Sequence, residues 1–318
     1  MTPEKVSPKR ASLLADVAEM YYLEGKDQTD IAREVGVSRS MISRMLTEAR
    51  RQGIVEIKVF RPIHSDHDLE EAIKDRFDIE SVFVVSMEDT KPEKLLTNLG
   101  SAAADVLKKL IRPDLVIGVA WGTAVSATVE AIQGMEEPSI KVIQLVGAQG
   151  ARNAEYDGHA IVKLLAEKVG GEGYYINAPY FCQTPEIAQS LRETRGIKET
   201  IDMGKQVQVA LLGIGTTEIE YSSYYLSGLL SNQEIEVFRK NGVVGDIAST
   251  YFKLDGNLYK DDFLTRMITI STDDLINIPV RIGIAGGAAK VNAIIGALNS
   301  KLVNYLVIDS FTARLITN

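Results

Sequence analysis

The stretch Gln28–Thr47, QTDIAREVGVSRSMISRMLT, has small, turn-forming and apolar residues at the spacing that two crossing helices need. Ala32 is small enough for a second helix to approach closely, and Gly36 can adopt the positive φ that the turn demands. We expect Val37 to plug the turn and Ser38 to cap the next helix. The apolar stripes that face one core are Ile31, Val35, Ile42, Met45 and Leu46.

The opposite face of the second helix is polar and basic. Such a face is typical of a helix-turn-helix whose second helix enters a DNA major groove. An ordinary helical hairpin with solvated arginines is the alternative. The segment Gly53–Val59 alternates apolar and polar residues like a strand, which favours a winged helix-turn-helix. The residues of the polar face are Arg39, Ser40, Ser43, Arg44 and Thr47.

Length and charge are compatible with a DNA-binding head on an acidic body. A chain of 318 residues suits two domains. The net charge of −8 argues at first against nucleic acid, but phosphate contact needs only a local positive field. Residues 39–61 supply that field, because basic side chains outnumber the acidic Glu48 and Glu56 there. The basic residues are Arg39, Arg44, Arg50, Arg51, Lys58 and Arg61.

Cysteine and histidine usage predicts neither disulfide nor metal chemistry. The single cysteine, Cys182, lies in an apolar-flanked run and is expected to be a buried thiol. His64 and His67 lie in or beside a predicted linker, Arg61–Asp66, with no cysteine or third histidine nearby, so we expect no metal site. With neither a signal peptide nor a membrane-length apolar run, we expect a soluble, cytoplasmic protein without a cofactor.

The chain divides at the linker. A first helix, Pro8–Tyr22, and the two-helix unit make a DNA-binding domain over residues 1–60. A short helix, Asp68–Phe77, leads into a second domain over residues 61–318. Apolar runs of strand length then alternate with amphipathic helices, which predicts an α/β fold with a doubly wound, mostly parallel sheet. The expected strands are Val82–Val85, Val116–Ala120, Val142–Val146, Tyr174–Asn177, Val207–Leu212, Arg281–Ala285 and Tyr305–Ile308.

Helices are expected between most of these strands. The stretch Ile219–Thr272 fits the alternation less well, and we expect a helical insertion around Tyr224–Lys240 with irregular strands after it. The expected helices are Glu93–Leu110, Ala124–Gln133, Glu155–Lys168, Ala188–Glu193 and Ala288–Leu298.

Three glycine-bearing turns follow strands of the second domain. In Trp121-Gly122-Thr123-Ala124 the amides of Thr123 and Ala124 open a helix, where amides and dipole together hold an anion. The second turn is Gly213-Ile214-Gly215, and the third is Gly286-Gly287 with Lys290 in the first turn of a helix. Because ligands gather at the carboxyl ends of strands in open α/β sheets, these turns predict a phosphate-binding cleft.

Lys290 opposes the dipole of its helix, which a ligand anion would explain. A Rossmann dinucleotide site is the rival for this turn, but its glycines fit G-x-G-x-x-G poorly. Asp246 can accept hydrogen bonds from sugar hydroxyls, whereas Asp255-Gly256 is interpreted as a structural turn. Trp121, the only tryptophan, either shields a sugar face or fills a core.

The order of several motifs resembles the SorC/DeoR-type bacterial transcriptional regulators. The head matches through Tyr21-Tyr22, the two-helix stretch and GIVEI. The body matches through its IGVAWGT strand and turn (residues 117–123), QLVG (144–147), MGK (203–205) and GDI (245–247). The segment Phe252–Gly256 and the C-terminal residues Gly286-Gly287, Lys290, Asp309 and Thr312-Ala313-Arg314 complete the pattern. Ala148 stands where a second glycine is usual, so the loop Gln149–Asn153 is expected to differ in shape. Val146 places no lysine at its strand end, which favours noncovalent effector binding.

The resemblance implies an effector domain with the fold of sugar-phosphate isomerases and deaminases (NagB/RpiA/CoA transferase-like), tetramers, and DNA binding governed by a sugar or sugar phosphate. No catalytic residue is expected; the rival is an isomerase- or deaminase-like enzyme with an appended head, in which Asp246 serves as a base. The expected DNA contacts are Gln28, Ser38, Arg39, Ser40, Ser43, Arg44, Arg50 and Arg51, with Lys58 on phosphate. The expected effector contacts are Gly122, Thr123, Ala124, Gln149, Gly213, Gly215, Asp246 and Lys290.

Overall fold

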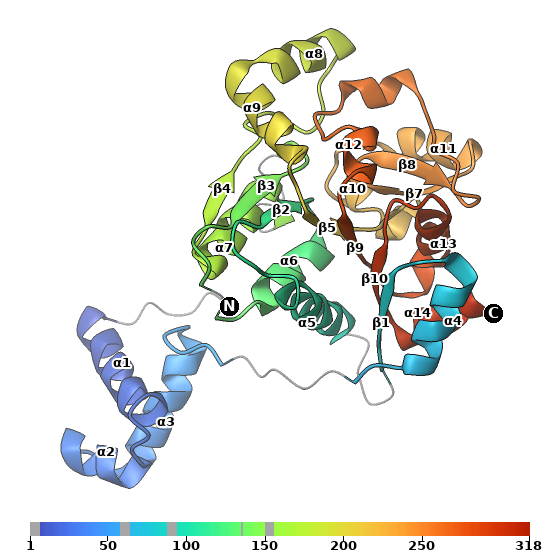
Figure 1. Ribbon diagram of the computed structural model, residues 1–318. Helices are drawn as coiled ribbons and strands as arrows, with labels where there is room; N and C mark the ends of the chain where they lie inside the picture. The colour runs from blue at the N-terminus through green and yellow to red at the C-terminus, as the bar shows by residue number, and fades with distance from the viewer. Residues whose placement is uncertain (1–6, 58–63, 88–93, 135, 150–155) are drawn as a thin grey trace. The chain divides into compact units, whose positions relative to one another are not determined.

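The structure, a computed structural model, describes residues 7–57, 64–87, 94–134, 136–149 and 156–318. The chain forms two compact units, Met1–Arg61 and Pro62–Asn318 (Figure 1). Lys58, Arg61 and most of the Gln149–Asn153 loop lie outside the described residues.

Within residues 7–57 the first unit holds three helices, α1 (Pro8–Tyr22), α2 (Gln28–Val35) and α3 (Arg39–Arg51). Asp27 caps α2 by accepting the backbone N–H groups of Thr29 and Asp30. The ends of the turn are formed as predicted from the sequence. Gly36 adopts a left-handed conformation with φ of 74°, and the Ser38 hydroxyl accepts the Met41 N–H at 3.3 Å to cap α3.

The three helices share one apolar core. Its buried members include Leu14 and Val17 from α1, Ile31 from α2, and Ile42 and Met45 from α3. The prediction that Val37 plugs the turn is wrong. The Val37 N–H closes the end of α2 on the Ala32 carbonyl at 2.9 Å, and the Val37 side chain is left 37 % exposed.

The predicted wing strand does not form over Gly53–Ile57. After α3 the N–H groups of Gly53 and Ile54 return to the Arg50 and Ala49 carbonyls, at 3.2 and 2.9 Å. This Schellman-type helix end turns Ile54 and Val55 onto the three-helix core. The apolar residues of the alternating pattern therefore cover the core. The rest of the predicted strand lies outside the described residues.

A seven-stranded parallel sheet forms the centre of the second unit, as far as the structure describes it, in the order β1-β10-β9-β5-β2-β3-β4. All seven strands predicted from the sequence take part. The edge strand β4 lies earlier than the predicted Tyr174–Asn177, because Glu172–Tyr174 pairs with Lys141–Ile143 of β3. The strands are β1 (Ser81–Val85), β2 (Val116–Val119), β3 (Lys141–Gln144), β4 (Glu172–Tyr174), β5 (Val209–Gly213), β9 (Val280–Ile284) and β10 (Tyr305–Asp309).

Helices cover both faces of this sheet, as a doubly wound fold requires (Figure 1). One core lies under α5 (Leu95–Lys108), α6 (Thr123–Ala131) and α7 (Gly158–Val169). The other lies under α4 (His67–Phe77), α13 (Val291–Asn299) and α14 (Ser310–Thr317), of which α14 was not predicted. The predicted start of α13 is corrected, because Ala288–Lys290 forms a separate 3-10 turn, η5. Further helices are α8 (Pro185–Glu193), α9 (Arg195–Gly204), α12 (Thr272–Ile276) and the 3-10 helix η4 (Asp262–Arg266), and of these only α8 was predicted.

The winding direction of the sheet reverses between β2 and β5. From β2 the chain proceeds outward through β3 to β4, whereas from β5 it proceeds the other way to β9 and β10. These two neighbouring strands mark a topological switch point, and the crevice beyond their carboxyl ends is where such folds bind ligands.

The predicted irregular region supplies a small second sheet next to that crevice. The antiparallel strands β6 (Gly215–Thr216), β7 (Val243–Ile247) and β8 (Thr250–Lys253) form it. The expected helical insertion is present before β7. Its elements are the 3-10 helix η3 (Ile219–Tyr221), α10 (Ser223–Leu226) and α11 (Asn232–Lys240).

Two further features match simple expectations from composition. Cys182 is buried, and burial raises the pKa of its thiol. Over the described parts of the chain, the helices lack the length and apolar character needed to traverse a bilayer.

Candidate functional site

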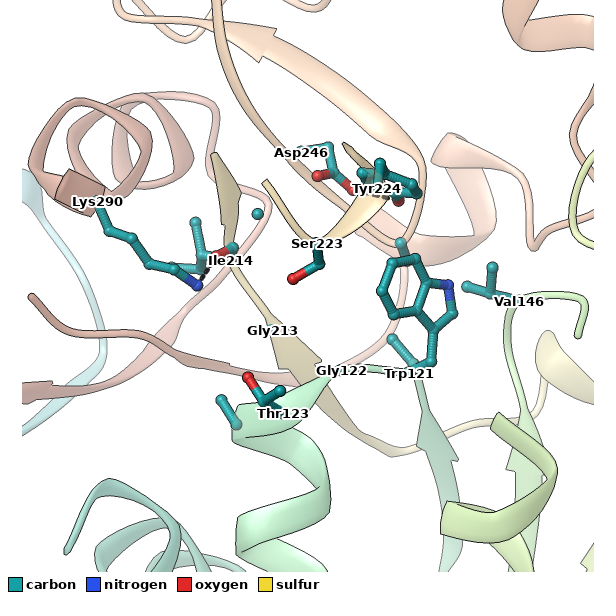
Figure 2. Close-up of a pocket in the computed structure, with 14 residues that line it drawn as sticks. Trp121, Gly122, Thr123, Val146, Gly213, Ile214, Ser223, Tyr224, Asp246 and Lys290 are labelled. Atoms are coloured by element: carbon teal, nitrogen blue, oxygen red, sulfur yellow. Dashed lines mark hydrogen bonds between the residues drawn. The ribbon is translucent and has the colours of Figure 1, made fainter. Parts of the chain in front are cut away.

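A pocket lies beyond the carboxyl ends of β2 and β5, at the switch point (Figure 2). Residues from all three predicted glycine turns meet there, together with residues of β7 and α10. Its lining residues are Ala120, Trp121, Gly122, Thr123, Ala124, Val146, Gly213, Ile214, Gly215, Ser223, Tyr224, Asp246, Ala248 and Lys290.

The Gly122 turn presents the start of α6 to the pocket. Gly122 has φ of 133°, a conformation that an L side chain rarely adopts, and it is the N-cap of α6. Because glycine offers no capping side chain, the amides of Thr123 and Ala124 keep their donors for another acceptor. The Thr123 side chain is exposed beside them. The turn thus combines helix-dipole potential with N–H and hydroxyl donors.

Lys290 reaches the pocket from the other side of the switch point. It ends η5 and is the N-cap of α13, so the prediction that it lies inside the first helical turn is corrected. Its Nζ donates to the Ile214 carbonyl at 2.7 Å, a bond drawn in Figure 2. Burial lowers the pKa of Lys290, and the Asp246 carboxylate opposes that shift.

The glycine pair before Lys290 has a structural role. The Gly287 N–H donates to Asp309 Oδ2 at 3.0 Å and to Thr312 Oγ1 at 2.7 Å. Asp309 also caps α14 through the Thr312 N–H at 2.9 Å. A Cβ at Gly286 would collide with the Asp309 carboxylate. These residues anchor the turn to the C-terminal helix, and neither glycine lines the pocket as described.

Asp246 supplies a buried carboxylate to the pocket wall. It is only 5 % exposed and is paired with Gly215 across the β6–β7 ladder. The Tyr224 hydroxyl donates to its Oδ2 at 2.7 Å. Burial raises the pKa of Asp246 to about 6, while the Tyr224 hydroxyl, the Ser249 N–H and Lys290 act in the opposite direction. The predicted turn at Asp255-Gly256 is confirmed, since Asp255 accepts the Asn257 N–H.

Aromatic rings form the wall between β2 and the insertion. Trp121 meets Tyr224 edge to face, with ring centroids 4.9 Å apart, and Tyr224 stacks on Tyr180 at 5.5 Å. Trp121 is half-buried, packs against the core and lines the pocket, and a sugar contact by its ring stays a prediction. Sequence reasoning missed Tyr224, and its only signal was its position in the predicted insertion.

Gln149 does not join the pocket. The described part of its environment places the backbone N–H 3.4 Å from Asp157 Oδ1 and leaves its side-chain amide nitrogen buried without a hydrogen-bond partner. A direct effector contact by Gln149 therefore stays a prediction. The other seven predicted effector contacts do line the pocket.

In the first unit, the polar face of α3 is exposed along its whole length. Arg39, Ser40, Ser43, Arg44 and Thr47 are all exposed, whereas the opposite face is buried. Ser38 is occupied at the helix cap, and its hydroxyl lies 2.9 Å from that of Ser40. Arg50 and Arg51 are exposed at the far end of α3, and Gln28 is half-buried at the start of α2. An Arg10–Glu48 ion pair at 2.7 Å fixes α3 against α1.

Comparison with known proteins finds a matching family model and similar transcriptional regulators. The family model Sugar-bind, "Putative sugar-binding domain", matches residues 61–318. The deoxyribonucleoside regulator of Bacillus subtilis (strain 168) is 27 % identical over 310 residues, which cover 98 % of each chain. The sorbitol operon regulator of Klebsiella pneumoniae is 28 % identical over 306 residues, covering 96 % of this chain and 97 % of that one.

A solved structure shows the same α/β fold with a mostly parallel sheet. The crystal structure of the full-length sorbitol operon regulator SorC from Klebsiella pneumoniae superposes with a TM-score of 0.76 at 26 % identity. The match covers 99 % of this chain and 100 % of that chain. These relatives are named as regulators, which does not favour the enzyme alternative. The chain belongs to the SorC/DeoR-type family of transcriptional regulators with a sugar-binding domain.

Proposed function

We propose that this protein regulates carbohydrate metabolism by binding operator DNA under the control of a sugar or sugar-phosphate effector. Residues 1–60 are the DNA-binding domain, a helix-turn-helix with α3 as recognition helix. Residues 61–318 bind the effector and assemble the protein into a homo-oligomer, a tetramer by family resemblance. The carrying observation is the pocket itself, where Lys290 and the α6 amides lie in one cavity with the buried Asp246 carboxylate.

That combination suits a phosphorylated sugar. Thr123, Ala124 and Lys290 would hold the phosphate, because helix-opening amides and an ammonium group both favour an anion. The Asp246 carboxylate would accept hydrogen bonds from hydroxyls, and the Trp121 ring would cover an apolar sugar face. The backbone at Gly122, Gly213 and Gly215 permits close approach. Gln149 remains a candidate contact.

The pocket supports binding better than turnover. Among the described lining residues Asp246 is the one carboxylate, and histidine is not among them, so these residues supply neither a carboxylate pair nor a carboxylate–histidine pair for acid–base exchange on a sugar. The parallel sheet with its site at the switch point supports the isomerase/deaminase-like (NagB/RpiA/CoA transferase-like) fold assignment.

The exposed face of α3 supports DNA recognition. Ser43 and Arg44 would contact base edges, since they lie within the helix on its solvent face. Arg50 and Arg51 would contact phosphates beyond the groove-entering turns. The further contacts proposed are Gln28, Ser38, Arg39 and Ser40.

Fluorescence anisotropy with duplexes from the chain's own genomic neighbourhood tests the proposal. Each duplex is titrated alone and with a panel of hexose and pentose phosphates and their free sugars. We expect tight binding to at least one duplex and a change of affinity with one sugar or sugar phosphate. Binding to none of them, with every sugar present, would refute the regulator assignment. Turnover of any panel member would favour the enzyme.

A further inference from the structure

The Asp246 carboxylate is fixed in the pocket wall on two sides. The Tyr224 hydroxyl holds Oδ2 at 2.7 Å. Oδ1 lies against the pocket-lining Gly215, where an added Cβ would collide with it. Figure 2 shows Asp246 and Tyr224 together on one wall, with Lys290 on the other side of the pocket. The carboxylate thus offers an acceptor whose position depends on the tyrosine.

Tyr224 is itself held rigidly. It is only 6 % exposed, and its ring is packed between Trp121 and Tyr180 with centroids 4.9 and 5.5 Å away. Burial raises the pKa of its hydroxyl well above the ordinary value, so the hydroxyl stays protonated and acts as a donor. A rigid donor to one carboxylate oxygen orients the other oxygen.

We propose that Tyr224 is a positioning residue of the effector pocket: its hydroxyl holds Asp246 as an oriented hydrogen-bond acceptor for a hydroxyl of the ligand. The inference deepens the proposed function and rests on it for the identity of the ligand. The hydrogen bond itself can be tested without ligand. The failure of one proposal is therefore distinguishable from the failure of the other.

Several titratable groups face Asp246, and the experiment must take account of each. Lys290 faces it from η5, Tyr224 from α10 and Tyr251 from β8, and Tyr180 comes from the segment after β4. The pKa of Asp246 is lowered by Tyr224, the Ser249 N–H and Lys290, against the larger effect of burial. Tyr251 is a matched control for Tyr224. It is 2 % exposed, and its hydroxyl is not among the hydrogen-bond donors to Asp246.

The first test is a pH titration of Trp121 fluorescence in the full-length, ligand-free protein. Trp121 is the only tryptophan and packs directly on Tyr224. We expect a transition near the Asp246 pKa of about 6, which Asp246→Asn removes. Tyr224→Phe should raise its midpoint by about one pH unit, because a donor to the ionised form is lost. Lys290→Met, which removes a nearby cation, is the positive control and raises the midpoint too.

Tyr251→Phe should leave the midpoint unchanged. An unchanged midpoint in Tyr224→Phe, or an equal shift in Tyr251→Phe, would overturn the proposal.

A second measurement applies even if Tyr224→Phe folds poorly. Loss of the Tyr224 donor should lower the unfolding free energy at about pH 7.5, where Asp246 is ionised. It should lower it much less at about pH 5, where Asp246 is protonated. Adding Asp246→Asn should remove that pH-dependent loss. If Tyr224 had only a packing role, Tyr224→Phe would lower the unfolding free energy equally at both pH values, and adding Asp246→Asn would not restore it. That outcome would also overturn the assignment.

Discussion

The pH dependence of stability offers a direct test of the buried carboxylate. In the folded protein burial raises the pKa of Asp246 from 3.8 to about 6. Between these values the native state retains a proton that the unfolded chain has released. Stabilisation from this site is therefore fully present below about pH 3.8 and is lost as the pH rises through 6.

The size of the effect follows from the shift. At 1.36 kcal/mol per pKa unit, a rise of about two units corresponds to ~3 kcal/mol of unfolding free energy. Asp246→Asn cannot titrate. The difference in unfolding free energy between variant and wild type should therefore change by ~2.5 kcal/mol of that span, in favour of the variant, from about pH 4 to pH 7.5. Taking the difference cancels the other titrating groups, which both proteins share.

Urea denaturation followed by circular dichroism, repeated across this pH range, measures the difference. Asp255→Asn is the control, because Asp255 is exposed and its pKa is lowered by the Asn257 amide groups. The stabilising contribution of Asp255 is lost only as the pH falls below the ordinary pKa of an aspartate. The difference in unfolding free energy between Asp255→Asn and wild type should therefore stay constant above about pH 4.5. A constant offset for Asp246→Asn would refute the buried-carboxylate argument. Ligand binding is a poorer test, because a sugar phosphate itself titrates near pH 6.

Three further predictions concern the two units separately. Arg44→Ala should weaken operator binding by about 1–3 kcal/mol in anisotropy titrations and relax sequence preference; an equal loss on random duplex would make Arg44 a phosphate contact only. Lys290→Ala should leave operator affinity intact and abolish the response to the sugar phosphate; a normal response would place the anion site elsewhere. Gly215→Ala should lower unfolding free energy by about 1–3 kcal/mol in urea titrations, since the new Cβ meets Asp246 Oδ1; unchanged stability would mean that the carboxylate can move aside.

Local rules explain why the head was predictable. The left-handed turn at Gly36 and the cap at Ser38 depend on residues within a few positions, and both form as expected. The predicted wing strand does not form over the described residues Gly53–Ile57, because alternation alone does not say what the apolar side chains will contact. Ile54 and Val55 pack against the nearby three-helix core instead of facing a partner strand.

The pocket was predictable where it consists of turns that follow sheet strands. Gly122 and Gly213 lie at the carboxyl ends of neighbouring strands, and Lys290 reaches them from the turn after β9. Tyr224 and Ala248 could not be found in this way. They reach the pocket through α10 and the β7–β8 hairpin, whose placement depends on long-range packing.

The β7–β8 hairpin also carries backbone strain that no sequence signal reveals. Its two turn residues, Ala248 and Ser249, have φ of 45° and 69°, where Asn and Gly are the usual residues. Each costs about 1–2 kcal/mol in this conformation. The same turn brings the Ser249 N–H to Asp246 and Ala248 to the pocket wall. A strained turn and a buried carboxylate therefore occupy one wall, and both lower the stability of the ligand-free protein at neutral pH. A ligand hydroxyl that donates to Asp246 would offset part of that cost, so the proposed ligand binding would be coupled to the order of this wall.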